Sequence, residues 1–203
     1  MLISSASFAD SLTGIARLQY RVSSENTQAV MQSLFLTFPN KSFFLELYEN
    51  YYQPKPFQHI DFTIGKKFPY EKKDIVDWVL RSQTYTGVGT IGSAGLQFNL
   101  VKNQRFNSFV QLFPLKTSPA LGKYDALHYY SIQLNNKLSL RGNNQLIILQ
   151  NNSNLLYCFV DVIYSINPRF DIYYRPSYSS HNNQYYGSKG VTNWIGFRIN
   201  FAI

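Results

Sequence analysis

Six arginines lie among Gln, Asn and Tyr in segments of alternating polarity, where their side chains could bind or select solutes. They are Arg17, Arg21, Arg141, Arg169, Arg175 and Arg198. Tyr173 and Asp171 alternate into the same polar face as Arg169 and Arg175. A guanidinium keeps its charge at physiological pH, and a wall of such groups favours anions, while Tyr can stack on a sugar or a base. We predict that these residues line a pore if the polar faces turn inward.

The same residues could instead close the interior. Four acids, Glu46, Asp61, Asp161 and Asp171, are placed to offset the positive field. If acids and arginines pair across a narrow interior, they plug it, and the protein then acts as an anchor or scaffold. The sequence does not decide between an open and a plugged interior.

Candidate nucleophiles and bases do not assemble into a predicted enzyme site. Ser179, His181 and Asn182 have the side chains of a hydrolytic site but lie in a polar, loop-like stretch. His128 and Ser131 are three residues apart and would face opposite sides of a strand. The lone Cys158 has no disulfide or zinc partner set in the sequence. We therefore predict no catalytic, cofactor-binding or metal-binding residues.

Composition limits the class of protein. The chain has 203 residues and a net charge of +8, yet only 15% of its residues are charged and 17% are aromatic. So few charges exclude a disordered basic tail. The basic residues are dispersed and carry no nucleic-acid-binding signature, so no nucleic-acid partner is predicted. The best apolar stretch, 155–164, is too short for a membrane-spanning helix and contains Asp161.

Polarity alternates with a period of two along most of the chain, which is typical of half-buried antiparallel strands. In the last segment Ile195, Phe197 and Phe201 alternate with polar or small residues. Turn-forming Asn, Pro and Gly separate the segments. The expected strands, about twelve with ten possible, cover 14–24, 28–38, 42–52, 57–66, 76–86, 89–101, 105–115, 124–134, 137–149, 154–165, 169–178 and 191–203.

The length of these segments and the placement of arginine favour a membrane barrel. Strands of about ten residues can cross a bilayer at a tilt, whereas soluble strands are usually half as long. Arginines on the polar face occur with Tyr and Asn rather than with the Lys and Glu expected of a water-exposed outer surface. The fold predicted for residues 1–203 is a single all-β domain, an antiparallel up-and-down transmembrane β-barrel.

The closing segment, residues 190–201, resembles the last strand of bacterial outer-membrane β-barrels in its alternating apolar residues and its aromatic Phe201. Ala202 and Ile203 follow that aromatic, which departs from the pattern. The size and strand count resemble small monomeric outer-membrane channels of the nucleoside-specific or acidic-oligosaccharide-specific type. This resemblance implies location in the bacterial outer membrane, contact with membrane lipid, passage of a small polar or anionic solute without a cofactor, and possible contacts with other envelope proteins.

Two alternatives stay open. One is a non-transporting barrel subunit of a larger outer-membrane assembly, and the other is a soluble β-sandwich with a binding or shell role. The pairs Asn135-Asn136, Asn143-Asn144 and Asn151-Asn152 recur every eight residues, which as successive turns would suit a sandwich. A long strand instead requires Asn143 in the lumen and Asn144 toward lipid, unless a bulge intervenes. Residues 1–13 are expected to be an N-terminal extension or the remnant of an export signal.

Overall fold

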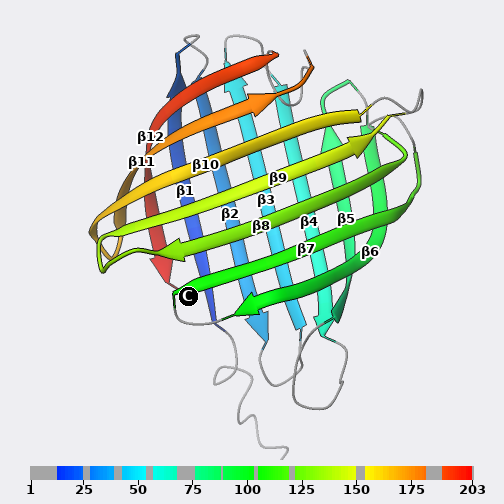
Figure 1. Ribbon diagram of the computed structural model, residues 1–203, viewed down its shortest axis with the longest axis horizontal. Helices are drawn as coiled ribbons and strands as arrows, with labels where there is room; N and C mark the ends of the chain where they lie inside the picture. Colours follow the sequence, from blue (N-terminus) through cyan, green and yellow to red (C-terminus); the bar gives the residue numbers. More distant parts are fainter. Residues whose placement is uncertain are drawn as a thin grey trace, which may run out of the picture.

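Twelve antiparallel strands form one closed barrel in the computed structural model (Figure 1). The structure describes residues 13–24, 28–38, 43–53, 57–67, 76–87, 89–102, 105–118, 122–149, 154–181 and 189–202. The strands are β1 (Thr13–Ser23), β2 (Gln28–Phe38), β3 (Phe43–Gln53), β4 (Phe57–Lys67), β5 (Val76–Tyr85), β6 (Gly89–Lys102), β7 (Phe106–Lys116), β8 (Tyr124–Gln133), β9 (Leu138–Ile148), β10 (Asn154–Asn167), β11 (Phe170–Ser179) and β12 (Gly190–Ala202).

Each strand pairs with its neighbours in the sequence, and β1 closes the barrel by pairing with β12. In Figure 1 the strands of one wall, β1 to β5, run across those of the other, β7 to β10, as expected when strands tilt about a barrel axis. Closure removes every sheet edge, so all backbone groups along the strands can pair without water. This up-and-down connectivity confirms the predicted topology.

The barrel is apolar outside and polar inside, which is the arrangement of a transmembrane barrel. On β11, Ile172 is 43% exposed whereas its neighbours Asp171 and Tyr173 are 4% and 2% exposed. On β12, Phe201 is 52% exposed and Arg198 is 4% exposed. The predicted direction of the alternating faces is therefore confirmed. The described residues contain no helix that is long and apolar enough to span a membrane.

The predicted strands agree with the observed strands to within two residues at every end. The exception that matters for the site is Arg169, which we expected at the start of a strand and which lies in the turn before β11. The side chain of Asn167 accepts hydrogen bonds from the backbone N–H groups of Arg169 and Phe170, at 2.9 and 3.0 Å. Such an Asx turn reverses the chain before the ladder resumes.

The asparagine pairs do not mark successive turns. Asn135 and Asn136 lie in the β8–β9 turn, whereas Asn143 and Asn144 lie inside β9, whose pairing with both neighbours is continuous. Asn143 is buried in the barrel and Asn144 is on the outer face, with no bulge between them. The interpretation of these pairs as turns of a sandwich is therefore wrong. Residues 1–13 were expected to be an N-terminal extension or export-signal remnant, but Thr13 is the first residue of β1, and residues 1–12 lie outside the described residues. Asn151, Asn152 and the side chain of Glu46 also lie outside them.

Candidate functional site

The lumen holds two cavities that share an arginine-lined boundary. The first has a volume of about 350 Å³ and lies at mid-barrel, and the second has a volume of about 560 Å³. The second is lined by the β10–β11 turn, Asn200 and Ala202, so it lies at the barrel end where the described chain begins and ends. Arg17, Arg141 and Arg198 line both cavities. Three guanidinium groups therefore border both spaces.

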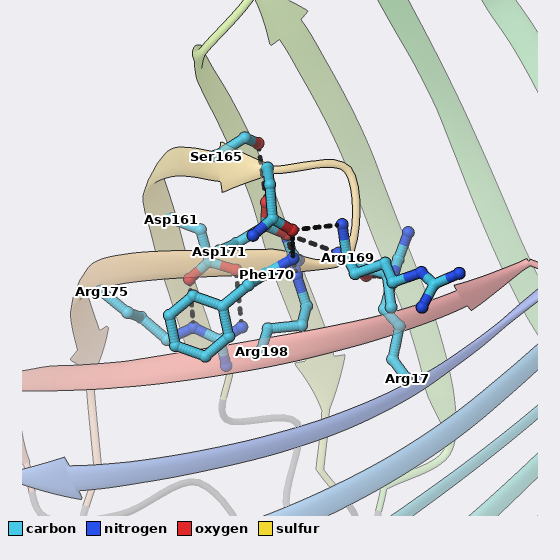
Figure 2. Close-up of polar contacts among 10 residues, drawn as sticks. Arg17, Asp161, Ser165, Arg169, Phe170, Asp171, Arg175 and Arg198 are labelled. Atoms are coloured by element: carbon cyan, nitrogen blue, oxygen red, sulfur yellow. Dashed lines mark hydrogen bonds and ion pairs between the residues drawn. The ribbon is translucent and has the colours of Figure 1, made fainter.

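Two of the predicted pore arginines form buried ion pairs with lumen acids (Figure 2). Arg175 donates from Nε and Nη2 to the two carboxylate oxygens of Asp161, at 2.5 and 2.8 Å. Arg198 approaches Asp171 through Nε at 2.9 Å and Nη2 at 2.8 Å. Ser165 and Asn200 also donate to Asp171, at 2.7 and 2.8 Å. These contacts neutralise each carboxylate at the edge of the cavity that it lines.

Arg141 is placed differently from the paired arginines. Its Cα lies opposite that of Asp161 in the β9–β10 ladder, but both oxygens of Asp161 are engaged by Arg175. Arg141 makes no hydrogen bond and no ion pair within 4 Å with any residue that the structure describes, and it lines both cavities. Arg141 thus presents its donors to the lumen.

The remaining predicted arginines lie along the same side of the interior. Arg17 donates from Nε to Asn200 Oδ1 at 3.1 Å, and Arg21 stacks over the ring of Trp194 at 4.6 Å. Arg169 lies in the β10–β11 turn (Figure 2). It is exposed and lines the second cavity. The structure therefore brings all six predicted arginines to the cavities or their mouth: Arg17, Arg21, Arg141, Arg175 and Arg198 at mid-barrel, and Arg169 at the barrel end.

Tyr173, also predicted for the pore, is inside the barrel but lines neither cavity. Its ring lies over Gly196, its partner in the β11–β12 ladder, where a Cβ would come within 2.9 Å of Tyr173 Cζ. The absence of a side chain at Gly196 lets the ring lie flat on the wall. Tyr173 therefore forms part of the wall, and Asp171 beside it lines the second cavity.

Sequence patterns did not single out Arg81, Phe109 or Tyr129, which lie on β5, β7 and β8 and line the first cavity. Asp61 was expected only as an acid that offsets the positive field. Arg81 pairs with Asp61, with Nε at 2.7 Å from the carboxylate, and both line the first cavity. Phe109 and Tyr129 stack with their ring centroids 5.0 Å apart and line the same cavity. Val79, Phe113 and Leu127 form a buried cluster beside them. Burial alternates along β5, but apolar residues such as Val79 on β5 and Leu127 on β8 also face inward, so the inward faces are not uniformly polar in the sequence.

The loop candidates for catalysis do not form a nucleophile–base pair. Ser179 Oγ donates to the backbone carbonyl of His181 at 2.7 Å, and the neighbouring Ser180 contacts the imidazole Nδ1 at 2.8 Å. Asn182 lies outside the described residues. In the part of the chain that the structure describes, no group of three or more His, Cys, Asp or Glu is placed to hold a metal ion.

Comparison with solved structures finds porins with the same barrel. A KdgM porin, solved in complex with disordered oligogalacturonate, matches with a TM-score of 0.65 at 8% identity, over 92% of this chain and 99% of that one. A NanC porin matches with a TM-score of 0.67 at 9% identity, over 91% of this chain and 98% of that one. No protein-family model matches, and no curated protein matches. At this identity the similarity shows the fold, and it agrees with the channel architecture that the sequence resembles.

Proposed function

We propose that this protein is an outer-membrane channel for small polar or anionic solutes. Its location in the bacterial outer membrane is part of the proposal, and it is supported by the transmembrane barrel fold shared with the KdgM and NanC porins. The KdgM structure was solved with oligogalacturonate, an anionic oligosaccharide. The same chemical class suits a lumen lined by arginine.

The position of Arg141 carries the proposal. Its cross-strand carboxylate is engaged by Arg175, and Arg141 lines both cavities without a hydrogen bond or ion pair to the described residues. An anionic group at the boundary of the cavities can take up the donors of Arg141, beside Arg17 and Arg198. The solute meets permanent charge in a space partly shielded from bulk water, where electrostatic attraction is stronger.

Transport of this kind needs no cofactor and no conformational cycle. Attraction to Arg169 at the mouth and Arg141 at the boundary raises the local concentration of anions, and diffusion does the rest. Phe109 and Tyr129 stack on β7 and β8, in the same wall as Arg141 on β9, and offer an apolar surface to one face of a sugar ring. Polar neutral solutes pass by hydrogen bonding to the Gln and Asn side chains.

A plugged barrel that serves as a scaffold is the second candidate. It is favoured by the apolar cluster of Val79, Phe113 and Leu127 inside the lumen and by the ion pairs that neutralise Asp61, Asp161 and Asp171. In that function the two cavities are closed water pockets. The flux of solutes distinguishes the two candidates.

The test is entry of size-matched sugars into proteoliposomes that contain the purified protein. A hexuronate should enter faster than a neutral hexose, and a cationic hexosamine should enter most slowly. Arg141→Ala should reduce the preference for hexuronate about fivefold, equivalent to about 1 kcal/mol of lost attraction. Lys137→Ala, which removes an exposed charge in the β8–β9 turn, is the control and should leave the preference unchanged. Failure of all three sugars to enter would support the scaffold.

A further inference from the structure

A hydrogen-bonded Ser, His and Asn lie together on the outer wall of the barrel. Ser108 Oγ is 2.9 Å from His128 Nε2, and the side-chain amide of Asn144 is 3.4 Å from His128 Nδ1. The three residues come from adjacent strands, β7, β8 and β9. They are 20 and 16 residues apart in sequence, so only the barrel register brings them together.

All three side chains point away from the lumen. Ser108 lies between Asn107 and Phe109, which both line the first cavity, and Asn144 lies between Asn143 and Gln145, which also line it. His128 follows Leu127, which is buried in the lumen cluster. The trio therefore lies in the outer wall, where His128 and Asn144 are half-buried and Ser108 is 4% exposed. Polar and ionisable groups are costly there and mark functional sites when they occur.

The arrangement has the order of contacts of a serine nucleophile, a histidine base and an orienting amide. One imidazole nitrogen is within hydrogen-bond reach of the hydroxyl, and the other faces the amide. The amide nitrogen and oxygen of Asn144 are interchangeable by a flip of the side chain, and with Oδ1 toward the ring Asn144 accepts the Nδ1–H. This fixes Nε2 as the proton acceptor for Ser108.

An apolar groove of about 270 Å³ begins beside the trio on the same outer face. It is lined mainly by Leu96, Leu112, Ala126 and Leu146 of four adjacent strands, together with Tyr124 and Ile148. Ala126 is two residues from His128 and Leu146 is two residues from Asn144, so the groove starts about 7 Å from the imidazole along the strands. Ala126 has the smallest side chain among its lining residues. The shape and chemistry suit an aliphatic chain.

We propose that Ser108, His128 and Asn144 form an esterase site that cleaves an acyl ester presented from the lipid phase, with the acyl chain in the Ala126 groove. Ser108 Oγ attacks the ester carbonyl carbon while His128 Nε2 takes the hydroxyl proton. The bond to the alcohol oxygen breaks, and the alcohol leaves with the proton from His128. Water then attacks the acyl-serine with His128 as base, which releases the fatty acid and restores the serine. Asn144 is a positioning residue.

The direct test is covalent labelling of the full chain in detergent with an alkyl fluorophosphonate, together with hydrolysis of a dodecanoyl nitrophenyl ester. The wild-type protein should be labelled and should release nitrophenol. Ser108→Ala and His128→Phe should each lower hydrolysis by about 100-fold or more and abolish labelling. Ser82→Ala, which removes an outward-facing serine of β5 that has no histidine contact in the described residues, is the matched control and should keep both.

Two further variants test the groove and the amide. Ala126→Phe fills the groove and should lower hydrolysis of the dodecanoyl ester while sparing the butanoyl ester. Asn144→Leu should lower the turnover number more than the KM, and Asn144→Asp should restore it, which a merely structural role would not produce. Barrel folding is checked by heat-modifiable gel migration and by retained conductance, which none of these outer-wall changes should alter.

The proposal is overturned if the wild-type protein shows no more labelling or hydrolysis than Ser108→Ala. It is equally overturned if His128→Phe retains full labelling. Those outcomes would show that the trio satisfies its own hydrogen bonds in the lipid-facing wall and does nothing more. Neither outcome bears on the channel, because sugar flux is measured separately.

Discussion

Arg175 and Asp161 form a two-pronged ion pair inside the barrel, between β11 and β10, with donor–acceptor distances of 2.5 and 2.8 Å. The pair takes the carboxylate that lies directly across the β9–β10 ladder from Arg141. The guanidinium of Arg175 also lies 3.9 Å from the ring centroid of Phe159. One acid thus neutralises one of two neighbouring arginines and leaves the other to face the lumen.

Removing this acid should lower stability. Asp161→Asn leaves Arg175 buried without its counter-charge, and we expect the free energy of unfolding to fall by about 2 to 3 kcal/mol, at the lower end for buried pairs because the lumen admits water. Urea unfolding in lipid vesicles measures it. The double variant Asp161→Asn with Arg175→Gln should recover at least half of the loss. An equal loss in the single and double variants would contradict the ion pair as the cause.

The face that each tryptophan occupies should be measurable by quenching. Trp78 is outward on β5, whereas Trp194 is inward beneath Arg21. These are the two tryptophans of the chain, so Trp194→Phe and Trp78→Phe give single-tryptophan proteins. Lipids brominated on the acyl chain should quench Trp78 strongly and Trp194 weakly. Equal quenching of both would contradict the assignment of faces.

A charge placed on the outer wall should destabilise the barrel according to its depth. Ile195→Lys, near the middle of β12, should cost about 2 to 4 kcal/mol, whereas Val191→Lys, near the start of the same strand, should cost about 0 to 1 kcal/mol. Both side chains are about two-thirds exposed, at 65% and 64%, so burial does not explain the difference. Vesicle unfolding experiments measure both, and equal costs would mean that this face does not contact hydrocarbon.

The contact of Tyr173 with Gly196 should be intolerant of added volume. A Cβ at residue 196 would lie 2.3 Å from the backbone oxygen of Tyr20 as well as 2.9 Å from the Tyr173 ring. We expect Gly196→Ala to lower the free energy of unfolding by about 1 to 3 kcal/mol. Gly92→Ala, whose Cβ would meet only the flexible Thr117 side chain at 3.1 Å, is the control and should cost less. Equal costs would show that the β11–β12 wall can relax.

Sequence patterns predicted the strands and their faces because alternation is a local property. Ile195 and Arg198 were assigned to opposite faces from spacing alone, and the structure places them so, with Ile195 exposed and Arg198 buried. Pairing across strands was not predictable in the same way. Whether Asp161 pairs with Arg141 or Arg175 depends on side-chain geometry in three adjacent strands, and the meeting of Ser108 with His128 depends on the β7–β8 register. The sequence indicated that Asn144 would face lipid in a long strand, but it did not indicate that His128 would be its hydrogen-bond partner.

The most direct measurement of the central claim is the reversal potential of single channels in a planar bilayer under a salt gradient. A channel lined by these arginines should show a steady conductance with a reversal potential of the sign that indicates anion preference. Arg141→Ala should shift that potential toward zero, whereas Asp161→Asn should shift it further toward the anion limit because two arginines then face the lumen. A protein that inserts without conducting, or that conducts with cation preference, would contradict the account.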